Sequence, residues 1–288
     1  MPLVTIVIRS KNDILYIGRT FEAILKQKFT DFEILNFDSG SDDGTWKIIQ
    51  KYNPDKSWRI GPDDYVPGKV LNDAVNKAEG KIIVFNNSDC IPLNENWLEK
   101  LIEPLLSSGA DKISAVLCNQ LARPDAFALV RKDNTRAFGD GSVSAKWEHF
   151  FSLASSAALR EKLLEYPFRE DLQYSEDIDW VWRMKKLNYE TAYVPDAKVE
   201  HSHNYSLREL KKRFYNEGVA EGQIYDVKKT FWCGFFFPCL AENVRDIIYL
   251  LKTGEILVLP RAVVYRIIQR FFSWKGRHDY LVNKKAGI

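Results

Sequence analysis

Short apolar runs alternate with segments of helical apolar spacing through the first part of the chain. Val4–Ile8 is a β-branched run between polar residues, which predicts a strand buried on both faces. Phe32–Phe37 predicts a second strand, and Trp46–Tyr52 predicts the helix after it. The helix between the two strands is indicated by apolar residues at three- and four-residue steps: Ile14, Ile17, Phe21, Ile24 and Leu25. Strands alternating with helices at this spacing predict a parallel sheet.

The same pattern continues as far as the middle of the chain. Helices are predicted over Lys69–Ala78 and Trp97–Leu106, and strands over Lys81–Phe85 and Ser114–Leu121. Arg131 to Lys146 is polar and has no period, which predicts a loop.

A further helix is predicted to begin at Glu176, with carboxylates in its first turn, where the helix dipole favours them. Asp179 and Arg183 lie four residues apart on it and are expected to pair. The following segments are predicted as a strand over Thr191–Val194, a loop over Val199–Tyr205 and a helix over Ser206–Gly218.

Composition indicates a globular protein of a reducing compartment. With 288 residues, 45% hydrophobic and 28% charged, disorder and a disulfide-framed miniprotein are excluded. The four cysteines form no C-x-x-C pair, which argues against a zinc ribbon. The first residues show no legible export signal, so we expect a cytoplasmic protein.

The net charge of +2 is an average over two different regions. From Arg261 onward the chain has seven Lys or Arg residues against one acid, Asp279, a net charge of +6. The preceding residues therefore carry −4, which argues against nucleic acid as a partner. The basic tail needs an explanation of its own.

Carboxylates fall where strands are expected to end or helices to begin, at Asp38, Asp89 and the pair Glu176 and Asp177. Ligands bind at the carboxyl edge of open α/β sheets, and carboxylates there suit Mg²⁺ or Mn²⁺. There is no Walker loop and no G-x-G-x-x-G, so a metal would have to neutralise any phosphate. Cys90 is interpreted as a buried apolar residue, not as a nucleophile.

Each of these residues also has a purely structural interpretation. Asp38 is a typical turn residue in Asp-Ser-Gly-Ser, Asp89 could cap the turn before Pro92, and first-turn carboxylates are common in helices. His201 and His203 alternate, so both could face one ligand, or both could lie on a surface loop. Trp180 could belong to the core.

Four motifs in order resemble those of the inverting family 2 glycosyltransferases, over roughly the first 205 residues. The motifs are Thr5-Ile6-Val7-Ile8-Arg9-Ser10-Lys11-Asn12, Asp38-Ser39-Gly40-Ser41-Asp42-Asp43-Gly44-Thr45, Asn87-Ser88-Asp89 and Ser175-Glu176-Asp177-Ile178-Asp179-Trp180. Together with His-Ser-His-Asn-Tyr-Ser at 201–206, they are most similar to bacterial rhamnosyltransferase-like enzymes of surface polysaccharide synthesis.

This resemblance implies an α/β protein of GT-A fold: a Rossmann-like, mostly parallel sheet flanked by helices, with a helical C-terminal extension. Residues 1–205 would form the catalytic domain, with the nucleotide sugar bound by 1–120 and the acceptor by 121–205. Residues 206–288 would form a basic, aromatic-rich helical region.

The resemblance also implies site residues. Asp38 would accept a hydrogen bond from a pyrimidine base, and the other expected nucleotide-sugar contacts are Thr5, Arg9, Lys69, Asn72 and Ser88. Asp89 would hold Mg²⁺ or Mn²⁺, with Asn87 standing where the family usually has a second Asp, and with His201 and His203 as candidate nitrogen ligands.

Asp177 would be the general base that draws a proton from the acceptor hydroxyl. The neighbouring Glu176 would raise its basicity. Trp180 would stack against an acceptor sugar ring, with Asp179 beside it in the acceptor site.

The implied activity is metal-dependent, inverting sugar transfer from a dTDP- or UDP-sugar, with rhamnose as a candidate sugar, to a glycan or lipid-linked glycan at the inner face of the cell membrane. One rival is a sugar nucleotidyltransferase, although Arg9-Ser10-Lys11-Asn12 lacks the glycine-rich loop usual there. The other rival is an inactive glycan-binding scaffold, suggested by Asn87.

The C-terminal third combines aromatic, apolar and basic residues. Thr230–Leu240 contains five aromatic residues, and Ile256–Phe272 is apolar but interrupted by Pro260 and three arginines. Neither segment is long enough to span a bilayer, but both suit the membrane interface, with basic residues attracted to anionic lipid. The alternatives are a helical subdomain packed on the catalytic core and a homodimer contact.

Overall fold

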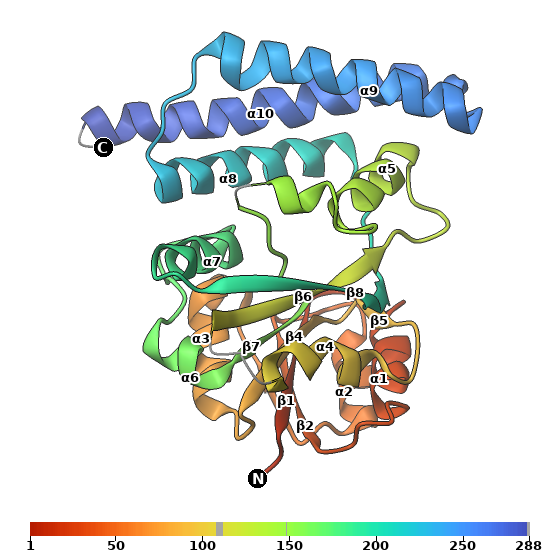
Figure 1. Cartoon of the computed structure of the whole chain (residues 1–288), viewed down its shortest axis with the longest axis vertical. Coiled ribbons are helices and arrows are strands. Elements are labelled where there is room, and N and C mark those ends of the chain that lie inside the picture. The colour runs from red at the N-terminus through yellow and green to blue at the C-terminus, as the bar shows by residue number, and fades with distance from the viewer. Residues whose placement is uncertain (108–111, 148, 287–288) are drawn as a thin grey trace. The chain divides into compact units, whose positions relative to one another are not determined.

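The computed structural model describes residues 1–107, 112–147 and 149–286 (Figure 1). The chain divides into two compact units. The first contains Met1–Arg123, Asn134–Asp171 and Glu176–Ser202, and the second contains Pro124–Asp133, Leu172–Ser175 and His203–Ile288.

The first unit is built around an eight-stranded mixed sheet in the order β3-β2-β1-β4-β7-β6-β8-β5. Its strands are β1 (Val4–Ser10), β2 (Phe32–Asp38), β3 (Lys56–Arg59), β4 (Ile82–Asn87), β5 (Ile91–Pro92), β6 (Ile113–Leu121), β7 (Ser155–Leu159) and β8 (Glu190–Glu200). β1 pairs in parallel with β2 and β4, and β2 with β3, whereas β7 is antiparallel to β4 and β6. The sequence did not reveal β3, β5 or β7, which are short or lack an apolar run.

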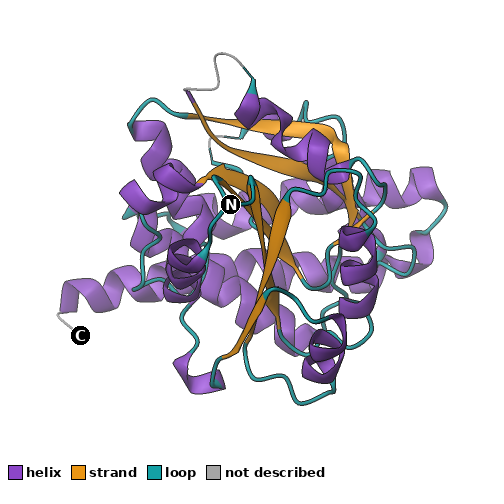
Figure 2. Ribbon diagram, turned by 90° about the horizontal axis from the view of Figure 1, so that it is seen from below, coloured by secondary structure: helices purple, strands orange, loops and turns teal. Residues whose placement is uncertain are grey.

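Helices cover both faces of this sheet, and Figure 2 shows the strands running between them. The α-helices of the first unit are α1 (Ile17–Leu25), α2 (Thr45–Tyr52), α3 (Pro67–Lys77), α4 (Trp97–Leu106), α6 (Arg160–Glu165) and α7 (Glu176–Lys186). Its 3₁₀ turns are Pro62–Asp64 and Ser144–Lys146. The elements predicted up to Leu121 are confirmed, with bounds shifted by up to three residues.

Alternating side chains of the central strands form two separate cores. In β4, Ile82 and Val84 pack with α1, α2 and α4, whereas Ile83 and Phe85 pack with α3 and α7. β1 and β6 divide in the same way, because successive side chains of a strand point to opposite faces. Burial on both faces explains why these strands are continuous apolar runs.

Two sequence predictions in this part are wrong. The short strand expected over Thr191–Val194 is the eleven-residue β8, which pairs with β6 and β5. Its register shifts between Val194 and Lys198, around Pro195, which has no N–H for a ladder bond. The loop expected from Arg131 instead contains the end of α5 (Ala128–Ala137), whose polar sequence hides its helical period.

The second unit is helical. It contains α8 (Leu207–Tyr225), a π-helical turn over Trp232–Phe236, α9 (Phe237–Thr253), a 3₁₀ turn over Ile256–Val258 and α10 (Leu259–Ala286), together with the start of α5. As expected, Ser206 caps α8, in a capping box with Glu209. Figure 1 shows α10 between α8 and α9.

Two glycines set the close approach of α8 and α10. A Cβ on Gly218 would lie 2.1 Å from the carbonyl oxygen of Ser273, and one on Gly276 would lie 2.0 Å from that of Tyr215. Helix α8 therefore continues past Gly218, where the sequence analysis ended it, because this glycine is a contact point and not a helix stop.

Most cations of the basic tail are paired within the second unit. Arg266 is buried between Asp133 and Asp246, Arg270 lies 3.0 Å from Glu242, and the remaining pairs are Lys275 with Asp279, Arg277 with Glu221 and Lys284 with Asp226. These pairs correct the prediction that the tail as a whole attracts lipid by its charge, because five of its seven cations have carboxylate partners. Among the described residues, the helices are too short or too polar to cross a membrane.

Candidate active site

Polar side chains gather where three parallel strands end. In the register of the sheet Ser10 lies opposite Asp38, and Arg9 opposite both Phe37 and Asn87. The carboxyl ends of β1, β2 and β4 therefore meet at one edge, as the sequence predicted and as is usual for ligand sites of open α/β sheets.

Arg9 connects this edge to the start of α7. Its guanidinium donates from Nη1 to Glu176 Oε1 and from Nη2 to Asn87 Oδ1, both at 3.2 Å. The side chains of Arg9 and Glu176 are 15% and 11% exposed. The ion pair thus brings the first-turn carboxylates of α7 to the end of β4, although 167 residues separate them along the chain.

Asp177 retains some exposed surface and has an unusual acidity. Its carboxylate accepts hydrogen bonds from the backbone N–H groups of Leu153, at 3.2 Å, and Ile178, at 2.8 Å. Loss of solvation and the neighbouring Glu176 nonetheless raise the pKa of Asp177 to about 6. A carboxylate with this pKa is ionised at neutral pH and is a stronger base than an ordinary aspartate.

Asp38 is fully buried at the end of β2. It accepts hydrogen bonds from the backbone N–H of Ser41 at 2.9 Å and from the hydroxyls of Ser41 and Ser10 at 2.6 and 3.2 Å. Arg59 Nε lies 3.8 Å from Oδ1. These partners fix the turn after β2, as the structural interpretation of Asp38 expects.

Ser88 lies in the loop after β4 and donates a hydrogen bond to Asp13. Burial raises the pKa of Asp13, and the bond from Ser88 opposes that shift. The sequence analysis treated Asp13 only as a helix cap, yet α1 begins later, at Ile17. Asp13 is therefore an additional carboxylate at the site.

One cluster in the described part of the chain could hold a metal ion, namely Asp89, Cys90 and His201, whose ligand atoms lie within 4.8 Å of one another. His201 Nε2 is 3.6 Å from Asp89 Oδ2, and its Nδ1 is 2.8 Å from Gln120 Oε1. Because the amide oxygen can only accept, Nδ1 carries the proton and Nε2 turns its lone pair toward Asp89. Burial raises the pKa of the Cys90 thiol well above its ordinary value, so Asp89 and His201 are the ready donors.

Arg123 is a site residue that the sequence analysis missed. Its guanidinium donates to the backbone oxygens of Asp89 and Ser202, lies 3.3 Å from Asp89 Oδ2 and covers the ring of Tyr16 at 3.8 Å. It follows the end of β6 by two residues, and no local pattern distinguishes it from a surface arginine.

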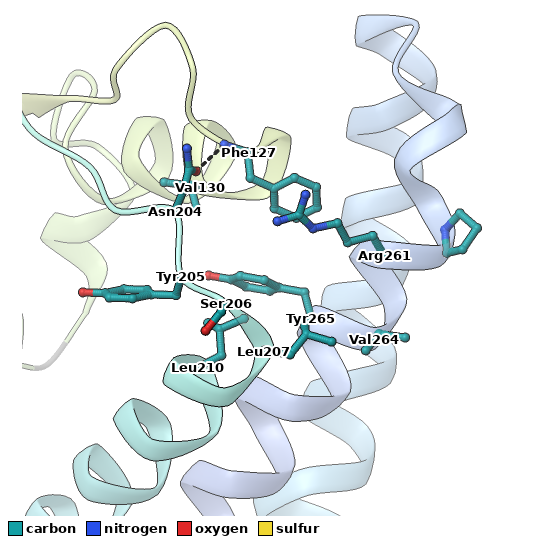
Figure 3. Close-up of a pocket in the computed structure, with 11 residues that line it drawn as sticks. Phe127, Val130, Asn204, Tyr205, Ser206, Leu207, Leu210, Arg261, Val264 and Tyr265 are labelled. Atoms are coloured by element: carbon teal, nitrogen blue, oxygen red, sulfur yellow. Dashed lines mark hydrogen bonds between the residues drawn. The ribbon is translucent and has the colours of Figure 1, made fainter.

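His203 is placed in the second unit, where its ring stacks on Tyr205 at 5.2 Å. The rest of the 201–206 motif lines a pocket of about 490 Å³ within that unit (Figure 3). The pocket is lined by Phe127, Val130, Asn204, Tyr205, Ser206, Leu207, Leu210, Pro260, Arg261, Val264 and Tyr265. Asn204 fixes its rim by accepting from the backbone N–H of Phe127 at 2.9 Å.

Three predicted nucleotide contacts lie outside the cluster at the sheet edge. Thr5 is buried near the start of β1, roughly 16 Å along the strand from Ser10, and its hydroxyl donates to Glu33 at 2.7 Å. Asn72 uses its amide to hold Phe168 and Glu170. Lys69 is exposed on α3.

The prediction that Trp180 stacks against a sugar ring is wrong. The residue is 1% exposed, and its indole N–H donates to the carbonyl oxygen of Tyr166 at 2.6 Å, so neither ring face is free. The expected pair of Asp179 with Arg183 is confirmed at 2.9 Å. Asp179 is equally buried and also lies 3.4 Å from Arg169, so it holds the start of α7 in place.

The chain is similar to O-antigen chain rhamnosyltransferases. One, from Salmonella anatum, is 29% identical over 273 residues, which cover 90% of this chain and 84% of the relative. Another, from Salmonella typhimurium, is 28% identical over 275 residues, covering 89% and 84%.

Solved structures confirm the predicted GT-A-type fold. A mannosyltransferase of Pyrobaculum calidifontis, in complex with GDP-Man and Mn²⁺, aligns with a TM-score of 0.67 at 19% identity and covers 98% of this chain and 88% of its own. Glucosyl-3-phosphoglycerate synthase of Mycobacterium tuberculosis, with Mn²⁺ and UDP, aligns with a TM-score of 0.53 at 19% identity, covering 77% and 80%.

The family model for glycosyl transferase family 2 matches residues 5–166, more than half of the chain and the part that carries the ends of β1, β2 and β4. The resemblance drawn from the motifs is confirmed: the chain belongs to glycosyl transferase family 2.

Proposed function

We propose that the chain transfers rhamnose, with inversion, from dTDP-rhamnose to a glycan acceptor of surface polysaccharide synthesis. The observation that carries this proposal is the link through Arg9, which joins the carboxylates of α7 to Asn87, two residues before Asp89. A base candidate and a metal candidate thereby lie at one sheet edge. The rhamnosyltransferase relatives support the choice of sugar.

Asp177 acts as the general base. Its carboxylate takes the proton of an acceptor hydroxyl while the hydroxyl oxygen forms a bond to the anomeric carbon of the donor. The bond from that carbon to the diphosphate breaks on the opposite side, and the nucleoside diphosphate leaves with the electron pair. A single base and a single displacement invert the anomeric configuration. Glu176 stays paired with Arg9 and keeps the pKa of Asp177 raised.

Asp89 and His201 fit a divalent cation, because an oxygen and a lone-pair nitrogen face each other and Gln120 fixes the imidazole. Such a cation, when bound, would stabilise the charge of the departing diphosphate. Neighbours of the same fold hold Mn²⁺ together with a nucleotide. Arg123 balances the charge of Asp89 from the protein side.

We further propose that the acceptor is a lipid-linked glycan, and that the enzyme works at the inner face of the cell membrane, in contact with it through the C-terminal region. The relatives act on O-antigen chains, as their names state. A homodimer is the alternative use of the same region.

Release of nucleoside diphosphate tests this function directly. The full chain is incubated with dTDP-rhamnose or UDP-sugars, an acceptor glycan and Mn²⁺, and the anomeric configuration of the product is read by NMR. We expect release only with donor and acceptor together, and a product of inverted configuration. Binding of donor without release would indicate a glycan-binding scaffold, and retention of configuration would exclude Asp177 as the base of a single displacement.

A further inference from the structure

Helix α9 turns its polar side toward the second unit and its apolar side outward. Its buried residues include Glu242 and Asp246, at 4% and 1% exposure. An α-helix on a protein surface in water normally does the reverse, with an apolar stripe packed inward.

The inward side of α9 is held by ion pairs within the second unit. Arg266 is 2.7 Å from Asp246, Lys132 is 3.6 Å from Glu242, and Arg270 is 3.0 Å from Glu242. Each of these carboxylates has at least two cationic partners. This pairing fixes which side of α9 faces outward, because turning the helix would leave buried charges without partners.

The outward side carries a continuous apolar surface, here termed the α9 face. It comprises Trp232, Phe236, Phe237, Leu240, Val244, Ile247, Ile248 and Leu251, each more than a third exposed. From Phe237 onward these residues recur at steps of three and four, and so occupy an arc of roughly 100° over a length of about 21 Å. The three aromatic rings contact one another at the start of the stripe.

Uncompensated positive charge lies at both ends of the α9 face. Lys228 and Lys229 precede Trp232, and Lys252 follows Leu251; all three are exposed, and the described residues offer them no carboxylate within 4.0 Å. The carboxylates of residues 227–286 are those of Glu242, Asp246, Glu255 and Asp279, each of which pairs with a cation.

We propose that the α9 face docks on an anionic lipid bilayer, with the helix lying in the plane of the interface. An apolar stripe with aromatic residues and flanking lysines has the chemistry of an interfacial helix. A second copy of this chain fits less well, because self-pairing in either direction brings lysines at the ends of one stripe against lysines of the other. The inference deepens the proposed function, on which it rests for the purpose of the contact, but docking requires neither donor nor acceptor.

Vesicle flotation of the full chain without donor or acceptor tests the docking. We expect binding to vesicles of phosphatidylcholine with phosphatidylglycerol, and at least about tenfold weaker binding for the triple variant Leu240→Gln, Val244→Gln, Leu251→Gln. The matched control is Leu25→Gln, Leu106→Gln, Leu187→Gln, which changes three similarly exposed leucines of the first unit. Equal loss in both triple variants, or no binding of the unchanged chain, overturns the proposal.

The lysines provide a second test that does not depend on the apolar variants. Lys228→Gln with Lys229→Gln is expected to weaken binding to the anionic vesicles by about fivefold per cation, and to leave binding to pure phosphatidylcholine unchanged. Equal effects on both vesicle types contradict the assignment to anionic lipid.

Two further measurements separate the other outcomes. If light scattering shows a dimer that the apolar triple variant converts to monomer, while vesicle binding is unchanged, the α9 face is a contact between copies and the proposal fails. Transfer to a water-soluble acceptor is expected to be unaffected in the triple variant. Vesicle binding without any transfer would leave docking intact and refute the proposed function, whereas transfer without vesicle binding would do the opposite.

Discussion

Buried charge has different roles in the two units of this protein. In the first unit, loss of solvation and the adjacent Glu176 raise the pKa of Asp177 to about 6. In the second unit, burial alone would raise the pKa of Glu242, but Arg245, Arg270 and Arg266 lower it to about 2. The same kind of side chain is thus made a better base in one unit and a fixed anion in the other.

The difference lies in the partners. Around Glu242 and Asp246, cations from α5, α9 and α10 match the buried carboxylates, and the cluster joins three helices. Around Asp177 the nearest ionised neighbour is another carboxylate, whose own cation, Arg9, is shared with Asn87. A group whose charged form is disfavoured can exchange a proton with a substrate, whereas a fully paired group can only hold structure.

The largest effect is expected from Asp177→Asn. Loss of a general base should reduce turnover by about 10²–10⁴-fold, because the acceptor hydroxyl then has no group to take its proton. Release of nucleoside diphosphate under saturating donor measures the loss, and a thermal shift with donor should be unchanged. Turnover within threefold of the unchanged chain would refute the assignment of Asp177.

Removing a cation from the paired cluster should affect stability instead. Arg266→Met leaves Asp246 buried with one partner fewer and should reduce the free energy of unfolding by about 3–5 kcal/mol. Chemical denaturation measures this change. The matched control is Lys284→Met, which breaks an exposed pair with Asp226 and should cost less than about 1 kcal/mol. Equal losses in the two variants would contradict the structural role of the cluster.

The two carboxylates should differ in how stability depends on pH. Between about pH 4 and 6 the folded state keeps a proton on Asp177 that the unfolded state has released, so stability falls as pH rises. Asp177→Asn should therefore be up to about 3 kcal/mol more stable than the unchanged chain above pH 6, and nearly equal to it near pH 4.

Glu242 should behave in the opposite way. Its lowered pKa contributes stability that is complete above its ordinary value of 4.5 and is lost as pH falls toward 2. Glu242→Gln should thus show the same deficit in melting temperature at pH 5 and pH 7.5, whereas the gain in Asp177→Asn grows between these values. Parallel pH profiles for both variants would remove the distinction between the units.

A smaller effect is expected at the imidazole of the metal candidate. Gln120→Leu removes the acceptor that holds the Nδ1 proton of His201, and should weaken Mn²⁺ binding by about 10–100-fold. Calorimetry with Mn²⁺ alone measures this change, and Gln120→Glu should restore most of the affinity because it keeps an acceptor oxygen. Unchanged affinity in Gln120→Leu would exclude His201 Nε2 as a ligand.

Local pattern predicted much of the first unit. The helix over Trp97–Leu106 was predicted with its observed bounds, and the ends of β1, β2 and β4 carry the expected Asp38 and Asn87. Apolar period and strand order are properties of neighbouring residues, so they can be read without the fold. The lengths of β8 and α8 could not, because contacts with β6 and with α10 extend them beyond their local signals.

The sequence by itself determined the family, the order of the elements and the positions of Asp38, Asp89 and Asp177, because motifs and apolar periods are local. Only the tertiary structure decided which side chains meet: Arg9 with Glu176, Arg123 with Asp89, and Trp180 with the core. It also turned Arg266 from a tail cation into a buried ion-pair partner and left the apolar side of α9 outward. Burial and pairing depend on residues far apart in the chain, and these two quantities distinguish a reactive carboxylate from a structural one.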